Sequence, residues 1–212
     1  MYRQETLDKY LNDASLDIST PGGGSVSALV GALGTSMVSM SASFTLGKEK
    51  FEDVEPQIKE IMGKSKNDRE ELLRLMEEDV EAYNGVNKAY SLPKSTEEEK
   101  KWRSSAIQSA LEKATDVPLR VMKNSLGLLA YTNELAKIAN PNLITEVGVA
   151  SLLANAALKG ALLNVEANLN YIKNKEIVSN VKREIEKVLE KAEKLIDDIM
   201  KKVEVTMRKN LT

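Results

Sequence analysis

Pro21-Gly22-Gly23-Gly24-Ser25 opens a stretch of sequence that contains no charged residue until Lys48. Apolar residues recur through this stretch, and small residues separate them: Ser27, Gly31, Gly34, Ser36, Ser39, Ser41 and Ser43. Because glycine lets neighbouring backbones approach closely, the sequence predicts a central buried helix over about residues 25–46 that Gly47 ends. Free backbone N–H groups at the start of a helix bind polar or anionic groups. The glycine turn is therefore a candidate ligand site.

The same stretch has two plainer interpretations. It is long enough to cross a bilayer, although its hydroxyl groups and glycines are many, its leucines are few, and no second candidate span follows. Alternatively, the glycines form only a turn, with Ser25 as the N-cap of the helix. Their spacing matches neither the G-x-G-x-x-G nor the Walker fingerprint. We expect no membrane insertion and neither kind of nucleotide site.

The composition restricts the chemistry. The 212 residues suffice for a single domain, 1–212, with a sizeable core. A formal net charge of −2 gives no basic field for a nucleic acid, and the first residues lack an apolar signal region, so we expect a cytoplasmic protein. Cysteine and histidine are absent, which removes thiol nucleophiles, the commonest general base and the usual zinc ligands. Acid–base chemistry must come from Asp, Glu, Lys or Tyr, and we expect no metal and no permanently bound cofactor.

Apolar periodicity predicts helices along the whole chain. A capping box within Ser95-Thr96-Glu97-Glu98-Glu99 separates two of them, Pro118 bends one, and the last is heptad-like and either wraps the bundle or pairs with a partner chain. No stretch alternates with period two, as a strand would. The sequence thus predicts an all-α, single-domain bundle of about six helices, in which the second and fifth are buried all round. The predicted helices cover residues 6–15, 25–46, 54–91, 102–131, 143–172 and 176–209.

Asp79 is the most informative charged residue. At about 100° per residue it falls in the middle of an apolar stripe of its helix. A carboxylate on a core face must be paired, hydrogen-bonded or protonated. Asp79 is therefore either a structural partner for a buried cation or a helix end, or a working acid or base. Tyr83, one turn later, is placed to hydrogen-bond it. The stripe consists of Leu72, Met76, Tyr83, Val86 and Tyr90.

The predicted fifth helix has one face that is small in the middle and polar near its ends. That face suits either a close helix crossing with satisfied amides or a flat ligand. Lys48, just beyond the central helix, reads in isolation as a solvated lysine that complements the helix dipole. The face consists of Glu146, Ala150, Leu153, Ala157, Gly160, Asn164 and Asn168.

Together these residues resemble a known family. From Leu7 to Asn174 the chain is similar to the cyclodeaminase/cyclohydrolase family of folate enzymes. The family comprises the cyclodeaminase half of formiminotransferase-cyclodeaminase and stand-alone methenyltetrahydrofolate cyclohydrolases. The motifs that carry the resemblance are Pro21 to Val26, Gly31-Ala32-Leu33-Gly34, Gly47-Lys48 with Phe51, Asp79 to Asn84, Val117-Pro118-Leu119, Gly148-Val149-Ala150, Asn164-Val165 and Asn168-Leu169.

The resemblance implies an all-α homodimer that binds a tetrahydrofolate derivative near the glycine turn. The implied reactions are loss of ammonia from 5-formiminotetrahydrofolate, which gives 5,10-methenyltetrahydrofolate, and hydration of the latter to 10-formyltetrahydrofolate. In one position the chain departs from the family, since Glu146 stands where the family usually has aspartate. The implied catalytic residues are Asp79 and Lys48, and the implied substrate-binding residues are Pro21, Gly22, Gly23, Gly24, Ser25, Tyr83, Glu146, Asn164 and Asn168.

This chemistry suits a carboxylate. The methenyl bridge is a cation, which a partly desolvated Asp79 would attract while taking a proton from the attacking water. In the same hypothesis, the N–H groups of the glycine turn and Lys48 bind the pterin or the anionic tail of the folate. The alternative is a non-catalytic protein, either a dimerising helical module or a folate carrier. The sequence leaves open whether deamination or hydrolysis is the reaction.

Overall fold

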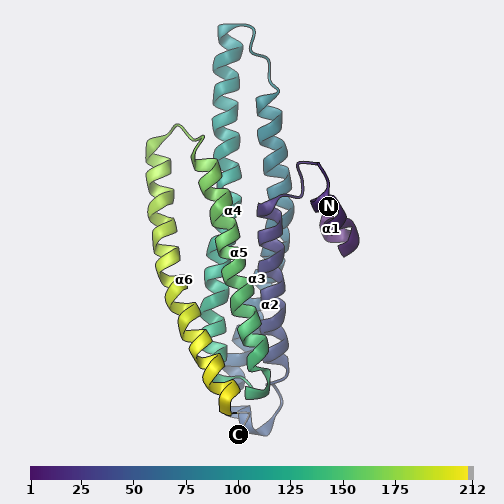
Figure 1. Cartoon of the computed structure of the whole chain (residues 1–212), viewed down its shortest axis with the longest axis vertical. Coiled ribbons are helices and arrows are strands. Elements are labelled where there is room, and N and C mark those ends of the chain that lie inside the picture. Colours follow the sequence, from purple (N-terminus) through teal and green to yellow (C-terminus); the bar gives the residue numbers. More distant parts are fainter. Residues whose placement is uncertain (210–212) are drawn as a thin grey trace.

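The computed structural model describes residues 1–209, and within this range the chain is helical without any strand. The prediction of an all-α fold is confirmed, because the described chain forms six α-helices and three short 3-10 helices (Figure 1). The α-helices are α1 (Leu7–Ser15), α2 (Gly23–Ser43), α3 (Glu55–Tyr90), α4 (Glu97–Ile138), α5 (Ile144–Leu169) and α6 (Lys175–Lys209). The 3-10 helices are η1 (Tyr2–Gln4), η2 (Glu49–Val54) and η3 (Pro141–Leu143).

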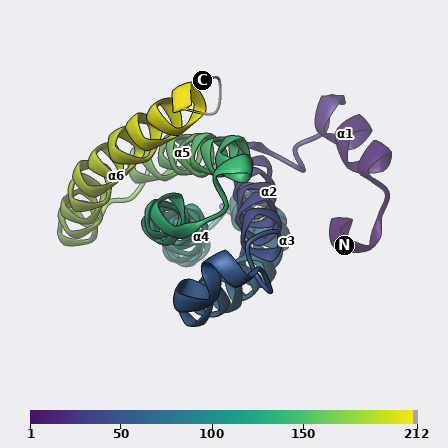
Figure 2. The same cartoon turned by 90° about the horizontal axis from the view of Figure 1, so that it is seen from below.

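Helices α2, α3, α4 and α5 form an up-and-down bundle in which each helix packs on its neighbours. Helix α6 lies outside this bundle against α4 and α5, and α1 lies apart, to the side of α2 and α3 (Figure 2). Helices α3 and α4 are the longest. Their hairpin, which we call the arm, extends well beyond the N-terminal end of α2 (Figure 1).

Small residues bring α2 and α5 close together, as the sequence predicted. A Cβ on Gly34 would lie 3.3 Å from the carbonyl oxygen of Ala150, and a Cβ on Gly160 would lie 2.5 Å from Ser27 Oγ. Gly31 faces Ala157 in the same contact. The small face of the fifth helix is therefore a helix crossing over most of its length.

The prediction that α2 and α5 are buried all round is wrong. Each helix leaves several large apolar side chains exposed to solvent. Composition alone cannot separate a core-facing stripe from an outer one, because both are apolar. The exposed residues are Val26, Leu33, Met40 and Phe44 on α2, and Val149, Leu152 and Leu163 on α5.

Two segments of the described chain are long and apolar enough to cross a membrane, Gly23–Ser43 and Pro141–Leu169. The expectation that no second candidate span follows the first is therefore wrong. About half of the 18-residue apolar stretch in each segment is buried inside the bundle, 56% and 44% respectively. Core helices of soluble proteins satisfy the same criterion.

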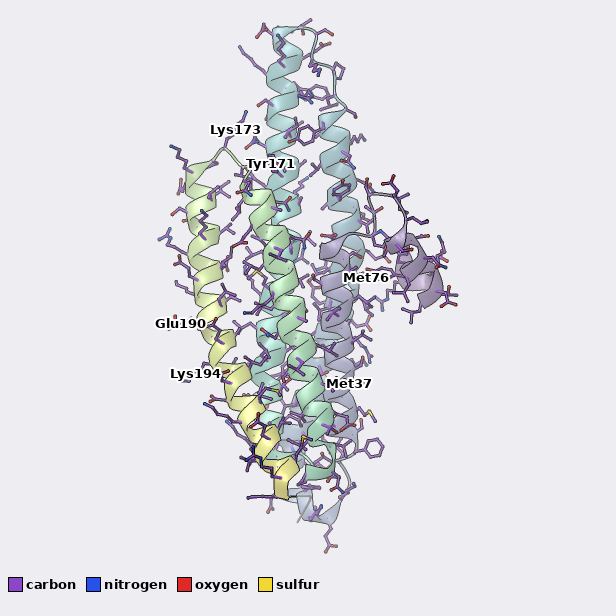
Figure 3. All side chains as sticks on the ribbon, viewed as in Figure 1. Met37, Met76, Tyr171, Lys173, Glu190 and Lys194 are labelled. Atoms are coloured by element: carbon purple, nitrogen blue, oxygen red, sulfur yellow. The ribbon has the colours of Figure 1, made fainter. Side chains whose placement is uncertain are left out.

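The remaining helices follow their sequence signals. Thr96 caps α4 and Glu99 completes the capping box, as predicted. Helix α4 continues on both sides of Pro118, and it is longer at each end than predicted. Helix α6 buries residues such as Val188 and Ile199 against the bundle, while Glu190 and Lys194 lie on its outer face (Figure 3). Within the chain, α6 therefore wraps the bundle.

Candidate functional site

The N-terminus of α2 is occupied by the carboxylate of Asp79. The backbone N–H of Ser25, in the first turn of α2, donates a hydrogen bond of 2.9 Å to Asp79 Oδ2. A Cβ on Gly24 would lie only 2.0 Å from Asp79 Oδ1, so no larger residue fits at position 24 while the carboxylate stays in place. Gly24, the last of the three glycines, thus admits a carboxylate to the positive end of the helix dipole.

Asp79 is half-buried, and burial raises the pKa of its carboxyl above the ordinary value of 3.8, while the hydrogen bond from Ser25 opposes this rise. Within residues 1–209, no Lys or Arg lies within ion-pair distance of Asp79. Of the alternatives left by the sequence, pairing with a buried cation is therefore not observed, and contact with a helix end is. A carboxylate held by one N–H donor keeps lone pairs available for a substrate.

Tyr10 is a neighbour that the sequence prediction missed. It is the one buried residue of α1, and its hydroxyl lies 3.0 Å from Ser25 Oγ. Burial raises the pKa of the Tyr10 hydroxyl, the hydrogen bond between Tyr10 and Ser25 lowers it, and the charge of Asp79 adds to the rise. The segment is also fixed by the backbone N–H of Arg3, which donates to Glu77 at 2.6 Å. The sequence signal that could have identified Tyr10 is its phenol, which lies on the apolar side of a short and otherwise polar helix.

Two asparagines of α5 extend the site. A Cβ on Gly23 would lie 3.3 Å from Asn164 Nδ2, so the Asn164 side chain borders the glycine turn. Its Nδ2 donates to the Gly160 carbonyl, and the Nδ2 of Asn168 donates to the Ala114 carbonyl on α4. The structure therefore brings the glycine turn, Asp79 and Asn164 together, with Asn168 one turn further along α5.

Lys48 and Glu146 do not join this group within one chain. Lys48 follows the other end of α2, which at 1.5 Å per residue is about 30 Å from the glycine turn. Glu146 lies in the first turn of α5 and accepts a hydrogen bond of 2.7 Å from Thr145 Oγ1. Because α2 and α5 run in opposite directions (Figure 1), both residues lie at the far end of the bundle.

The apolar stripe of α3 changes from buried to exposed where α2 begins. Leu72 and Met76 are buried, whereas Tyr83 and Tyr90 are 42% and 43% exposed. Within residues 1–209 we find no hydrogen bond from Tyr83 to Asp79, which corrects that expectation. Half-exposed aromatic rings beyond a carboxylate are suited to a flat, partly apolar ligand.

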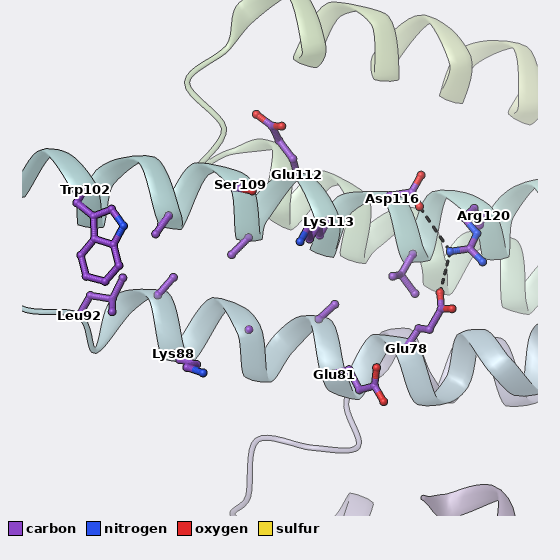
Figure 4. Close-up of a pocket in the computed structure, with 16 residues that line it drawn as sticks. Glu78, Glu81, Lys88, Leu92, Trp102, Ser109, Glu112, Lys113, Asp116 and Arg120 are labelled. Atoms are coloured by element: carbon purple, nitrogen blue, oxygen red, sulfur yellow. Dashed lines mark hydrogen bonds and ion pairs between the residues drawn. The ribbon is translucent and has the colours of Figure 1, made fainter.

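A groove of about 990 Å³ lies on another face of the arm (Figure 4). It contains Trp102 and the ion pair between Arg120 and Glu78, but its lining does not include Asp79 or the glycine turn. Small side chains of α3 and α4 form its floor. This groove is therefore separate from the candidate site.

Within the described residues 1–209, no group of three or more acidic side chains is arranged to hold a metal ion. The site as described can bind a polar or cationic group, accept or release a proton at Asp79, and hold a flat ring system against α3.

Comparison with known proteins identifies the family. The sequence profile of the formiminotransferase-cyclodeaminase family matches residues 6–187. The chain belongs to this family. The family predicted from the glycine turn and the later motifs is confirmed.

Named relatives include both activities that the sequence left open. A methenyltetrahydrofolate cyclohydrolase from Methylorubrum extorquens is 37% identical over 96% of this chain and 98% of its own length. The formimidoyltransferase-cyclodeaminase of Rattus norvegicus is 28% identical over 88% of this chain, which spans only 35% of that protein. A crystal structure of formiminotetrahydrofolate cyclodeaminase from Thermotoga maritima superposes with a TM-score of 0.90, at 29% identity, over 98% of this chain and 100% of that one. This crystal structure thus has the same fold as the chain over its whole length.

Proposed function

We propose that this protein is a folate one-carbon enzyme in which Asp79 transfers the proton. It hydrolyses 5,10-methenyltetrahydrofolate, or releases ammonia from 5-formiminotetrahydrofolate, or does both. The observation that carries the proposal is the half-buried Asp79 carboxylate, which is held at the start of α2 by one N–H donor. The names of the relatives support a folate substrate.

In the hydrolytic reaction, the ionised Asp79 attracts the cationic methenyl bridge and takes a proton from the water that attacks the bridge carbon. The carbon–N5 bond then breaks as N5 takes up the proton from Asp79, the remaining hydroxyl proton passes to solvent, and the formyl group stays on N10. In the deamination, N10 attacks the carbon of the protonated formimino group. Asp79 then carries the N10 proton to the departing nitrogen, which now holds three hydrogens and leaves as ammonia, and the positive charge stays on the methenyl bridge.

The surrounding residues orient these groups. The α2 dipole favours the ionised form of Asp79, which opposes the effect of burial on the pKa of this carboxyl. Tyr10 is a positioning residue, because its hydroxyl meets Ser25 rather than Asp79. The Asn164 Oδ1 atom, which would lie 3.6 Å from a Cβ on Gly23, is an acceptor for N–H groups of a pterin.

The greater identity to a cyclohydrolase along its whole length favours hydrolysis over deamination. The loss of near-ultraviolet absorbance of 5,10-methenyltetrahydrofolate tests hydrolysis, and its gain from the formimino substrate tests deamination. Asp79→Asn should lower the rate at least about a hundredfold if the residue performs acid–base work. Glu81→Gln, an exposed acid on the same helix, is the matched control and should change little.

The rival, a non-catalytic helical module or folate carrier, predicts binding or no binding without turnover. If wild-type protein accelerates neither reaction over buffer, the enzymatic proposal is refuted. If Asp79→Asn is as active as wild type, the assignment of the proton to Asp79 is refuted, whatever the activity.

We also propose that the protein is a homodimer that pairs through the outer face of α2 and α5. Exposed Leu33, Met40 and Leu152 support this, since a contiguous apolar face of this kind is typical of subunit contacts. Leu33→Glu should convert the dimer to a monomer in sedimentation velocity. Lys66→Glu, an exposed change on α3 outside this face, is the control.

A two-fold axis perpendicular to α2 would carry Lys48 and Glu146 of one protomer toward the glycine turn of the other. This is the arrangement in which the proposed roles of these two residues would hold. Mixing inactive Asp79→Asn with inactive Lys48→Ala should then restore up to about a quarter of the activity, since random exchange of symmetric protomers regenerates intact sites. An active Lys48→Ala protein would remove Lys48 from the mechanism.

We further propose a cytoplasmic location, no permanently bound cofactor, and neither nucleic acid nor membrane as a partner. The net charge of −2 and the absence of cysteine support these expectations. A carboxylate and a helix terminus supply the chemistry without a cofactor.

A further inference from the structure

We propose that three oxygen-bearing side chains inside the bundle bind a monovalent cation, Na⁺ or K⁺. They are Ser65 and Asp68 on α3 and Tyr131 on α4, and we call them the oxygen cluster. The cluster lies apart from the candidate site, because Asp68 precedes Asp79 by eleven residues of α3, which corresponds to about 16 Å of helix. The inference therefore goes beyond the proposed function and does not depend on it.

Ser65 offers the cluster a lone pair and not a proton. The residue is fully buried, and its Oγ donates a hydrogen bond of 2.7 Å to the carbonyl of Thr35 on α2. Ser39 Oγ lies 3.0 Å from Ser65 Oγ, and because the Ser65 proton is used at Thr35, Ser39 is the donor of this second bond. One lone pair of the Ser65 hydroxyl is then left to accept a further donor or to bind a cation.

Tyr131 contributes a buried hydroxyl that lacks a partner. The residue is 4% exposed, and its hydroxyl lies close enough to Asp68 and Ser65 for both side chains to influence its pKa. This hydroxyl is nevertheless one of the buried polar atoms of residues 1–209 that have no hydrogen-bond partner. Leaving a buried hydroxyl unsatisfied is costly, and a ligand shared by the three side chains would remove that cost.

Asp68 carries a negative charge that the described chain does not balance. Within residues 1–209, no Lys or Arg lies within ion-pair distance of its carboxylate. Burial raises the pKa of the Asp68 carboxyl, the nearby Tyr131 hydroxyl lowers it, and the charge of Glu71 raises it. Glu71 is itself paired with Arg74 and Arg120, so those two cations are engaged elsewhere. A bound cation would stabilise a half-buried carboxylate in this setting.

The charge and the donor set of the cluster select a monovalent cation. Ca²⁺ takes about six to eight oxygen ligands, with carboxylates prominent among them, and residues 1–209 contain no group of three or more acidic side chains that could hold a metal ion. A neutral water would satisfy the Tyr131 hydroxyl but would leave the charge of Asp68 unbalanced. A monovalent cation does both. A site with a single carboxylate gives no signal in the sequence, from which we expected no metal.

The ion can enter from solvent beside Asp68. The carboxylate is only half-buried, and Gly127 of α4 lies next to it. A Cβ on Gly127 would lie 3.9 Å from Asp68 Oδ2, so the neighbouring residue carries no side chain that would cover the carboxylate. Water molecules on this open side would complete the coordination shell of the ion.

The experiment compares salts of equal ionic strength and needs no folate. Thermal unfolding of the full-length protein is followed in about 100 mM NaCl, KCl or choline chloride, whose cation is too large for the cluster. With a dissociation constant of about 10 mM, the bound ion would lower the unfolding constant about tenfold. We therefore expect NaCl or KCl to raise Tm by about 3–5 °C over choline chloride. A crystal of the wild type soaked in RbCl should show an anomalous peak between Asp68, Tyr131 and Ser65.

Three variants locate the effect. Asp68→Asn should remove the difference between the salts, and Tyr131→Phe should reduce it. Asp53→Asn makes the same change at an exposed position of η2 and should keep the wild-type difference. Equal midpoints of the wild type in all three salts, an undiminished difference in Asp68→Asn, or the absence of a rubidium peak would overturn the inference. Because the rubidium measurement uses the wild type, the test does not depend on the folding of any variant.

Discussion

Gly24→Ala tests whether the close approach of Asp79 to α2 is what makes the site work. The added Cβ would lie 2.0 Å from Asp79 Oδ1, 2.6 Å from Cγ and 2.8 Å from Oδ2. Ordinary van der Waals contact begins near 3.4 Å, so the carboxylate must retreat by about 1.4 Å, which stretches the 2.9 Å hydrogen bond from Ser25 beyond bonding distance.

Two magnitudes follow. A misplacement of about 1 Å costs on the order of a hundredfold in rate, so we expect Gly24→Ala to lower kcat/KM for 5,10-methenyltetrahydrofolate about a hundredfold. The lost hydrogen bond to a charged group would lower the free energy of unfolding by about 1.5–3 kcal/mol. Alanine is the better helix former, which offsets up to about 1 kcal/mol of this loss.

The assay combines steady-state kinetics with thermal unfolding followed by circular dichroism. Gly63→Ala is the matched control, because no atom lies within 4 Å of its added Cβ. It should retain full activity and gain up to about 1 kcal/mol of stability from its higher helix propensity. A folded Gly24→Ala protein with activity within threefold of wild type would refute the reasoning.

Three other predictions concern the site and the core. Since burial raises the pKa of Asp79 above 3.8 and the base form is required, kcat/KM should fall as pH decreases through this raised pKa, and Asp79→Asn should lose that limb of the pH–rate profile. Because the pKa of Asp79 is raised in the folded state, the folded protein binds this proton more tightly than the unfolded chain does. The contribution of Asp79 to the free energy of unfolding is therefore greatest below pH 3.8 and is lost as pH rises through the pKa of the folded state. Denaturant titrations at neutral pH should find Asp79→Asn as stable as wild type or more so. Gly34→Ala should destabilise the bundle by about 1–3 kcal/mol in the same titrations, because its Cβ would lie 3.0 Å from a Leu128 methyl group and 3.3 Å from the Ala150 carbonyl; an unchanged midpoint would show that α2 and α5 can separate at little cost.

Much of the fold was predictable because its signals are local. Apolar period, the capping box before α4 and the glycine run specify helices without reference to the rest of the chain. The inward position of Asp79 also came from counting along one helix. The same counting identifies Asp68, three turns earlier, whose pKa burial also raises, and the prediction did not include it.

The predictions that failed concern relations between helices. Periodicity places Lys48 and Glu146 on their own helices, but it does not say which ends of antiparallel helices lie together. It also cannot show that the second apolar stripe of α2, with Leu33, faces outward. The contact of Tyr10 with Ser25 depends on how the chain before residue 20 folds back, which no periodic signal encodes.

The N-terminal segment, residues 1–20, contributes little to the bundle, since Leu7, Leu11, Leu16 and Ile18 are exposed. It is fastened by Tyr10 at Ser25 and by Arg3 at α3. An affinity tag joined ahead of Met1 would therefore disturb the contacts of Arg3 and Tyr10, which lie close to Asp79. A tag carried by the end of α6 would lie away from this segment, at the lower end of the molecule in Figure 1. Proteolytic removal of the first twenty residues should leave the helical bundle folded, but it would remove Tyr10 and its hydrogen bond to Ser25 beside Asp79.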